Sequence, residues 1–178
     1  MSAYNKAMHT KDIHLPISRE QLRSLRAGDE VELFGVAYMV SVPAHELLAS
    51  LLKNNEPLPF SLFGASFYYS LPGEVFRPFG PNTCLHVDAY TPLLVKRGVS
   101  AMIGRGDRIE AVRAAMFMRA VYFIPRGGAE AVQNKCAIEP QISAFPNLKD
   151  DAIRRIFFMG LPAVVGMDSF GGSIYFEE

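Results

Sequence analysis

The chain has only two cysteines, Cys84 and Cys136, among its 178 residues. Two thiols do not make a disulfide framework, and a [4Fe–4S] cluster is held by about three to four cysteine thiolates, so this chain does not hold one alone. Neither a Cys-x-x-Cys nor a His-x-x-x-His spacing occurs, so a zinc site built by this chain alone is not expected either. The low cysteine count is typical of the reducing cytoplasm, which is the location we expect.

Excess charge and long hydrophobic runs are also absent. The 18 Lys and Arg residues balance the 18 Asp and Glu residues, which argues against nucleic-acid binding through bulk charge. No apolar run approaches the ~18–20 residues of a membrane span, and the polar stretch 1–11 lacks the apolar segment of a secretory signal. Arg19, Arg23 and Arg26 form a local basic spot, for which a solvated helix face is the ordinary interpretation.

What the chain does have is enough hydrophobic sequence to build a core. Its hydrophobic fraction is 49%, and a chain of this length typically forms one domain. We therefore expect a flexible tail over residues 1–14 and a single domain over residues 15–178.

The pattern along the chain predicts an α/β fold with a mixed central sheet and flanking helices. Strands and helices alternate over residues 64–135, which predicts parallel pairing with right-handed crossovers. The N-terminal third is more mixed: polar and apolar residues alternate over 30–34, and Gly35 followed by 36–40 predicts a hairpin or a bent strand. Residues 150–158 are ambiguous between helix and strand, and residues 162–168 are typical of a buried strand.

The most unusual stretch is Gly80-Pro81-Asn82-Thr83-Cys84-Leu85-His86-Val87-Asp88. It places a thiol, an amide, a hydroxyl, an imidazole and a carboxylate within nine positions after a Gly-Pro break. Such a mixture of polar side chains is not typical of a core segment, whereas it is typical of a loop that faces a small polar ligand. Cys84 and His86 would share a face on a strand and could form a thiolate–imidazole pair, although no third orienting group is evident.

Gly104-Arg105-Gly106 lies between a predicted strand and a predicted helix. The glycines allow a close backbone approach, the helix N-terminus offers free N–H groups, and Arg105 or Arg108 adds a cation, so an anion cradle is one interpretation. An ordinary strand-to-helix turn with solvated arginines is the other. Ile109 stands where a dinucleotide fingerprint has its third glycine, which excludes an NAD site.

His45 is predicted in the first turn of a helix that begins near Pro43. The positive end of the helix dipole disfavours the imidazolium form there. A neutral imidazole could act as a base or a hydrogen-bond partner. A partly buried histidine that caps its own helix is the alternative.

Taken in order, these segments resemble the β subunit, or C-terminal domain, of class I iron–sulfur fumarate hydratases and L-tartrate dehydratases. The resemblance covers nearly the whole chain. The segments that carry it are Leu15-Pro16-Ile17-Ser18, residues 25–31, Gly35 with Pro43-Ala44-His45, Pro72-Gly73, Gly80-Pro81-Asn82-Thr83, Gly104-Arg105-Gly106, Ala120-Val121-Tyr122 with Gly127-Gly128-Ala129, and Leu161-Pro162-Ala163-Val164-Val165 with Asp168.

The resemblance implies a swivelling β/β/α domain and a division of labour between two chains. An α-type subunit would carry the [4Fe–4S] cluster, whose iron acts on the substrate hydroxyl as a Lewis acid. This chain would close over a small carboxylate substrate within an oligomer. It binds no cofactor by itself in that arrangement, and neither nucleic acid nor a membrane is an expected partner.

The resemblance also implies site residues. His45, Thr83 and His86 are the expected catalytic residues, and Asn82, Gly104, Arg105 and Gly106 are the expected substrate-binding residues; no residue is expected to bind metal. Within these sets, His45 and Arg105 would contact the carboxylate, and His86 or Thr83 would take part in proton transfer.

Departures from the family pattern fall on the same positions. The family's Arg-Asp-x-Ala-His is Ser41-Val42-Pro43-Ala44-His45 here, and in its Gly-Pro-Thr-Thr-Ser-x-Arg-Met-Asp loop the first Thr is Asn82 and the Arg is His86. A charge-assisted contact to a carboxylate is worth ~1.5–3 kcal/mol, so the loss of two arginines predicts weak binding of the family's usual acids.

Three functions remain open from the sequence. The first is a β subunit of an iron–sulfur hydro-lyase that adds or eliminates water on a small hydroxy- or dicarboxylic acid. The second is a re-tasked domain of the same fold that binds a small anion or metabolite without catalysis. The third is a single-chain thiol enzyme that uses Cys84 and His86.

Overall fold

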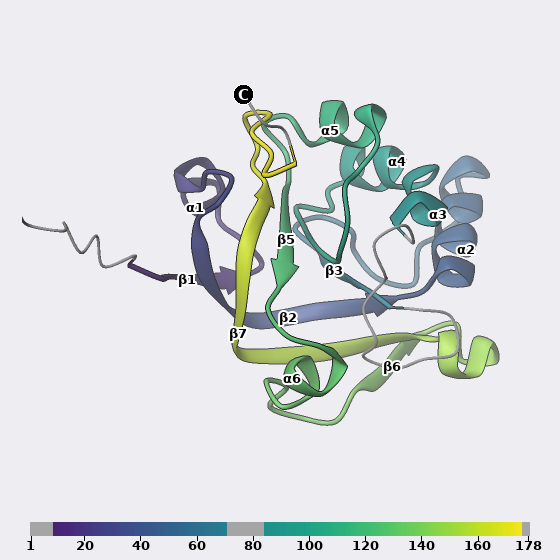
Figure 1. Cartoon of the computed structure of the whole chain (residues 1–178). Coiled ribbons are helices and arrows are strands. Elements are labelled where there is room, and N and C mark those ends of the chain that lie inside the picture. The colour runs from purple at the N-terminus through teal and green to yellow at the C-terminus, as the bar shows by residue number, and fades with distance from the viewer. Residues whose placement is uncertain (1–8, 71–83, 176–178) are drawn as a thin grey trace, which may run out of the picture.

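The computed structural model describes residues 9–70 and 84–175, which form a mixed α/β fold around one curved sheet (Figure 1). The strands are β1 (Lys11–Leu15), β2 (Glu30–Val40), β3 (Ser66–Tyr69), β4 (Ala101–Ile103), β5 (Val121–Pro125), β6 (Gln141–Ala144) and β7 (Ile153–Met167). The helices are α1 (Arg19–Ser24), α2 (Val42–Lys53), α3 (Cys84–Asp88), α4 (Thr91–Lys96), α5 (Glu110–Met116) and α6 (Ala129–Gln133), with a 3-10 helix η1 (Pro146–Asp151).

Five strands of the sheet close into a barrel-like ring. Strands β2, β3, β4 and β5 are parallel neighbours, and β7 runs antiparallel to both β5 and β2 and so closes the ring. Strand β1 adds to β2 in parallel, and β6 adds to β7 antiparallel. The prediction of a mixed sheet with flanking helices is confirmed, as is the parallel pairing of β3, β4 and β5. The antiparallel strand that makes the sheet mixed is β7, not a strand of the N-terminal third.

The two long strands β2 and β7 pair along most of their length and both bend (Figure 1). In β7, Gly160 has no partner in β2 because the register shifts between Leu33 and Phe34, and its φ of 78° is one that glycine adopts without strain. In β2, Gly35 has a φ of 105° within a continuous strand. The bent strand is therefore confirmed and the hairpin is wrong. The ambiguous segment 150–158 belongs mainly to β7.

Strand β1 corrects the end of the flexible tail predicted over residues 1–14, since residues 11–14 belong to this strand, while residues 1–8 lie outside the described residues. Lys11 to His14 pair in register with β2, from Lys11 opposite Val31 to His14 opposite Phe34. Ile13 is buried, and the ammonium of Lys11 forms an ion pair with Asp29 at 2.6 Å. The sequence signal is weak because only alternate residues of this short strand face the core.

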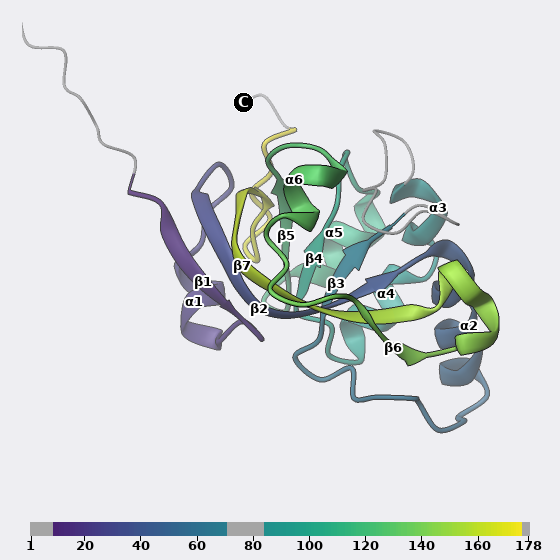
Figure 2. The same cartoon turned by 90° about the horizontal axis from the view of Figure 1, so that it is seen from below.

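Successive side chains of the central strands point to opposite faces of the sheet and so pack into two different hydrophobic cores. In β3, Phe67 and Tyr69 enter a core covered by α2, α4 and α5, whereas Tyr68 enters a core that fills the ring and lies against α1 and α6. Figures 1 and 2 show α2 and α4 on the opposite side of the molecule from α1. Ser18 caps the N-terminus of α1, since its hydroxyl accepts a hydrogen bond from the backbone N–H of Gln21 at 3.1 Å.

The fold brings the predicted site segments to one edge of the sheet. Because β2 to β5 are parallel, the segments that follow them meet at their carboxyl ends, where ligands of α/β proteins usually bind. His45 follows β2 in the first turns of α2, Gly104-Arg105-Gly106 follows β4, and Gly127 follows β5.

The bend of β2 gives a test of the fold. A Cβ atom at Gly35 would lie 2.2 Å from the carbonyl oxygen of Leu15, whereas a Cβ atom at Gly28, which also has a positive φ, meets nothing within 4 Å. We expect Gly35→Ala to lower the free energy of unfolding by about 3 kcal/mol or more, and Gly28→Ala by about 1 kcal/mol. Urea unfolding followed by circular dichroism measures both. Equal losses in the two variants would contradict the close approach of β1 to β2.

Candidate functional site

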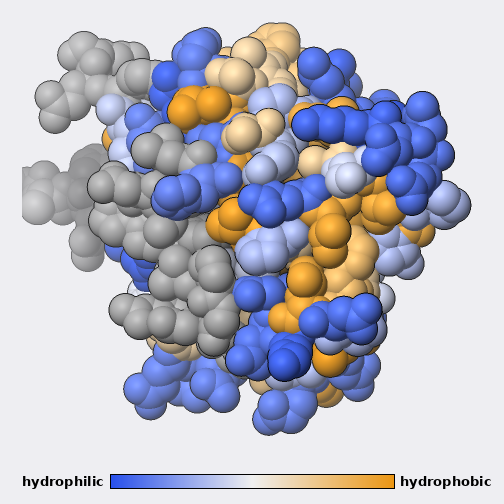
Figure 3. Space-filling view, turned by 90° about the vertical axis from the view of Figure 1, so that its right-hand side faces the viewer, coloured by the Kyte–Doolittle hydropathy of each residue, from blue (hydrophilic) through white to orange (hydrophobic). Residues whose placement is uncertain are grey.

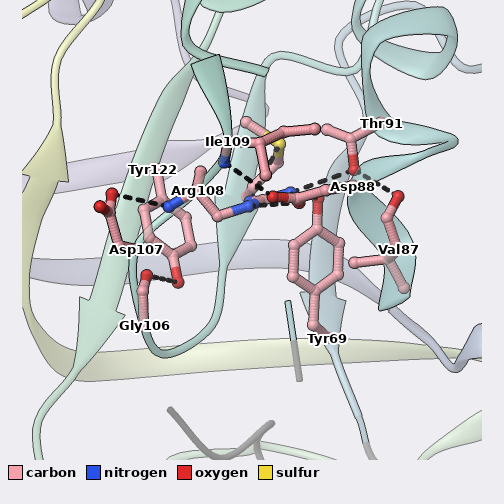
Figure 4. Close-up of polar contacts among 10 residues, drawn as sticks. Tyr69, Val87, Asp88, Thr91, Gly106, Asp107, Arg108, Ile109 and Tyr122 are labelled. Carbon is pink, nitrogen blue, oxygen red and sulfur yellow. Dashed lines mark hydrogen bonds and ion pairs between the residues drawn. The ribbon is translucent and has the colours of Figure 1, made fainter. Parts of the chain in front are cut away.

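A buried ion pair between Arg108 and Asp88 occupies the centre of the polar cluster at this edge (Figure 4). The Nη2 of Arg108 lies 2.6 Å from Oδ1 of Asp88, and its Nε donates to the same oxygen at 2.7 Å. Both side chains are almost completely buried, at 0% and 1% exposed. A buried charge pair is tolerated only where its remaining donors and acceptors are also satisfied.

The surroundings of Arg108 meet that requirement. Its guanidinium lies between the rings of Tyr69 and Tyr122, with centroid distances of 4.9 and 5.0 Å. Nη2 also donates to Oγ1 of Thr91 at 3.0 Å and to the hydroxyl of Tyr69 at 3.3 Å. Thr91 in turn donates to the carbonyl of Val87 at 3.0 Å. The ion pair therefore ties β3, α3 and α4 to the start of α5.

The carboxylate of Asp88, which belongs to α3, also binds the N-terminus of α5. Its Oδ2 accepts a hydrogen bond from the backbone N–H of Ile109 at 3.0 Å, and Asp107 accepts from the N–H of Arg108 at 2.7 Å. The sequence offered this helix start, with Arg105 or Arg108, as an anion cradle. The structure places an internal carboxylate at the start of α5, and Arg108 is committed to that carboxylate.

The remaining residues of the turn are arranged around Tyr122 and the β5–α6 loop. Arg105 is half-buried and donates from Nη2 to the carbonyl of Gly127. Gly106 has a φ of 90°, and its carbonyl accepts from the hydroxyl of Tyr122 at 3.0 Å. A Cβ atom at Gly104 would lie 3.0 Å from the ring of Tyr69, so the glycine allows the turn to pack against that ring. These three positions thus lie next to the rings that enclose Arg108.

His45 is completely buried, with its ring 5.2 Å from that of Tyr69 and 5.8 Å from that of Phe67, both edge-on. Its Nδ1 lies 2.8 Å from the carbonyl oxygen of Ser41. A carbonyl only accepts, so Nδ1 carries the proton in the neutral ring and Nε2 holds a free lone pair. Within residues 9–70 and 84–175, no hydrogen-bond partner of Nε2 is found.

The environment of His45 keeps its ring neutral. Burial, opposed by the hydrogen bond to Ser41 and supported by the positive charge of Arg108, lowers the pKa of His45 from 6.5 to about 4. The sequence predicted a neutral ring from the helix dipole, and the larger physical cause is desolvation. An imidazole with an unprotonated Nε2 at neutral pH has the form that a proton acceptor needs.

The other predicted catalytic residues are placed differently. His86 lies on α3 with its side chain exposed, whereas Val87 and Asp88 of that helix are buried. Cys84 to Asp88 form a helix and not a strand, so the strand geometry on which a Cys84–His86 pair was predicted is wrong. Asn82 and Thr83 lie outside the described residues.

Cys136 is not poised to act as a nucleophile. Burial, together with the charge of Glu139, raises the pKa of the Cys136 thiol to about 11, so the thiol is protonated at neutral pH. Its side chain packs against the core that fills the ring.

The structure therefore brings His45 close to the Arg108–Asp88 pair through Tyr69, and it brings Gly104 and Gly106 to Tyr69 and Tyr122. It leaves the side chain of His86 outside this cluster. The sequence missed Tyr69 and Tyr122, because aromatic residues in strands are typical of a core. One signal was available: Tyr69 and Tyr122 lie in the two strands predicted on either side of the strand that leads to Arg108.

Neither a metal site nor a membrane span is found in the part of the chain that the structure describes. No group of three or more His, Cys, Asp or Glu side chains there could hold a metal ion. No helix there is long and apolar enough to cross a membrane.

Comparison with known proteins gives a consistent result. Residues 2–178 match the family described as Fumarase C-terminus. A fumarate hydratase 2 from Leishmania major is 29% identical over 175 residues, which is 92% of this chain and 31% of that protein. A protein assigned as an L(+)-tartrate dehydratase subunit beta from Methanocaldococcus jannaschii is 27% identical over 90% of this chain and 89% of its own length. The chain thus spans about a third of the fumarate hydratase and nearly all of the tartrate dehydratase subunit.

The buried ion pair gives a prediction for stability. Arg108→Met should lower the free energy of unfolding by about 3–5 kcal/mol, because it leaves the buried carboxylate of Asp88 without its cation. Combining it with Asp88→Asn should cost much less than the sum of the two single losses. The exposed pair between Arg113 and Glu110 is a matched control, and Glu110→Gln should cost about 0.5 kcal/mol or less.

Chemical unfolding of the four variants measures these differences. Additive losses for Arg108→Met and Asp88→Asn would contradict direct coupling between the two side chains.

The neutral form of His45 predicts a pH dependence of stability. The unfolded chain takes up a proton on this residue below pH 6.5, whereas the folded chain does so only near pH 4. Unfolding is therefore favoured as the pH falls through that window, by about 1.4 kcal/mol per pH unit and about 3 kcal/mol in total. His45→Gln removes this contribution, whereas His14→Gln, at an exposed position of β1, keeps it.

Unfolding free energies measured between pH 7 and pH 4 test this expectation. The same pH slope in the wild-type chain and in His45→Gln would show that His45 is not held neutral.

Proposed function

Because the chain belongs to the Fumarase C-terminus family, we propose that it is the β subunit of a two-component hydro-lyase that adds or removes water on a small hydroxy- or dicarboxylic acid. The observation that carries this proposal is the buried, neutral His45, whose Nε2 has no hydrogen-bond partner among the described residues. The likeness to the tartrate dehydratase subunit beta, 27% identical over 90% of this chain, supports the assignment to a β-type component.

In this proposal His45 exchanges the proton of the reaction. Dehydration of a hydroxy acid removes a proton from the carbon next to the carboxylate, and a base must lie within hydrogen-bond reach of that proton. Nε2 is suited to accept it, and the hydrogen bond from Nδ1 to Ser41 fixes the tautomer. The resulting imidazolium would be destabilised by burial and by Arg108, so it returns its proton readily.

Arg105 is our candidate for the carboxylate-binding cation. Its guanidinium donates a hydrogen bond to the neutral carbonyl of Gly127, beside the β4–α5 turn. A substrate carboxylate in place of that carbonyl would form a charge-assisted bond worth ~1.5–3 kcal/mol. Gly104 and Gly106 allow the backbone to approach the ligand there. Asn82, Thr83 and His86 are assigned to the same site by the family resemblance alone.

The iron–sulfur cluster belongs to the partner in this proposal. The described residues offer no cluster-binding set, and the chain has two cysteines, so we derive no step on this chain through the cluster. When bound to the partner, the cluster would supply a Lewis acid for the leaving hydroxyl. Such a complex is expected in the reducing cytoplasm.

The face that carries α2 and α3 is suited to contact the partner. Figure 3 shows a band of hydrophobic side chains on this face between hydrophilic ones, and Leu47 of α2 is 40% exposed. This face lies beside the carboxyl ends of the parallel strands, so a subunit bound there would lie next to α2, the helix that contains His45. Hydrophobic residues of this kind form the centre of protein interfaces, with polar residues at the rim.

A second function is favoured by the substitutions in the family motif. Where the family has Arg-Asp, this chain has Ser41 and Val42, and the hydroxyl of Ser41 is used to donate to the carbonyl of Asp151 at 3.2 Å. Two of the family's arginines are absent at Ser41 and His86. A domain that binds a small anion without turning it over is therefore the alternative. Calorimetry with dicarboxylates up to millimolar concentration tests it, and no binding by the chain alone would exclude it.

The main proposal is tested by reconstitution with an α-type chain that binds a cluster. We expect consumption of a small hydroxy acid only when both chains are present. His45→Gln should lower kcat by a factor of about 10²–10⁴ while the complex stays assembled, because general-base catalysis contributes on that order. His14→Gln is the matched control and should keep full kcat.

Two results would contradict the proposal. One is equal turnover by the α-type chain alone. The other is a His45→Gln complex with unchanged kcat across pH 6–8.

A further inference from the structure

A second polar feature lies at the opposite edge of the parallel strands. Gly64, Ser100 and Arg119 lie within two residues of the starts of β3, β4 and β5, and all three line one groove with a cavity volume of about 530 Å³. We call it the basic groove because five cations line it and no Asp or Glu does. These cations are Arg19, Arg23, Lys96, Arg97 and Arg119.

The charge of the basic groove is not balanced by neighbouring carboxylates. Elsewhere on the surface, Lys11, Arg113 and Arg126 form ion pairs with acidic residues. For the five cations of the groove, no ion pair or side-chain hydrogen bond is found among residues 9–70 and 84–175. The whole chain is neutral, with 18 residues of each charge, so this concentration of unpaired positive charge favours a polyanionic ligand.

The floor and rim of the groove add two further groups. The hydroxyl of Ser100 is buried in it and has no hydrogen-bond partner within the described ranges, a state that usually marks a missing ligand or water. Phe63 at the rim is 83% exposed. Its backbone is held in place, since Gly98 lies so close that a Cβ there would be 2.7 Å from Cα of Phe63. An exposed aromatic ring on such a backbone is suited to stack on a planar ring.

We propose that the basic groove binds a nucleoside polyphosphate, by chemical class a small molecule that joins several phosphates to a planar ring. Its volume lies in the range of about 300–1,000 Å³ typical of small-molecule sites. The guanidinium groups of Arg19, Arg97 and Arg119 suit phosphate oxygens, and Phe63 suits the base. The groove lies across the sheet from His45, so this binding is independent of the proposed hydro-lyase reaction.

Calorimetry on the full chain at low salt tests the proposal with four probes: ATP, inorganic triphosphate, adenosine and hexaglutamate. We expect ATP to bind about tenfold more tightly than triphosphate, because stacking on Phe63 adds to the phosphate contacts. Adenosine and hexaglutamate should bind far more weakly than ATP. Added salt should weaken the binding of ATP and triphosphate.

Variants assign the binding to this groove. Arg97→Gln and Arg19→Gln should each weaken both phosphate ligands about tenfold, and Phe63→Leu should bring ATP to the level of triphosphate without changing triphosphate. Lys135→Gln, which removes an exposed cation at the end of α6, should change neither.

Three results would overturn the proposal: no ATP binding at millimolar concentration, unchanged affinity in Arg97→Gln, or hexaglutamate that binds as tightly as ATP. The last would assign the groove to an acidic protein segment instead.

Discussion

The buried ion pair of Arg108 and Asp88 is the interaction on which the carboxyl edge of the sheet depends. Two charges leave water there, and only a complete set of partners makes that burial tolerable. Tyr69, Thr91 and the N–H of Ile109 supply those partners from three different elements. The ion pair therefore fixes the positions of α3, the start of α5 and the turn after β4 relative to one another. A displacement of one of them would displace the others.

The same pair determines what His45 can do. The charge of Arg108 adds to burial in keeping the imidazole neutral, and the ring of Tyr69 lies between the two side chains. A catalytic base must be unprotonated and fixed in orientation, and the hydrogen bond to Ser41 meets the second condition. In the proposed function this environment suits His45 to proton transfer, although Ser41, Asn82 and His86 depart from the pattern of the family that the chain resembles.

The sequence predicted the alternation of strands and helices well, because local periodicity and turn residues carry that information. It predicted the site segments in part: His45 and the turn at Gly104 to Gly106 lie at one edge because parallel strands end there. It did not predict β1, whose short alternating pattern is weak, or the helix at Cys84 to Asp88. Nor could it show that Asp88 would take Arg108 as its partner, since 20 residues separate them in the chain and only the fold joins them.

The central claim is that the substrate meets Nε2 of His45, and ¹⁵N spectroscopy of the histidines in the reconstituted complex tests it most directly. Before substrate is added, His45 should show the neutral tautomer with the proton on Nδ1. A hydroxy acid that is turned over should shift the Nε2 signal of His45 and leave that of His14 unchanged. An unchanged His45 signal in a complex saturated with a substrate that it consumes would contradict the account, because the base would then lie elsewhere.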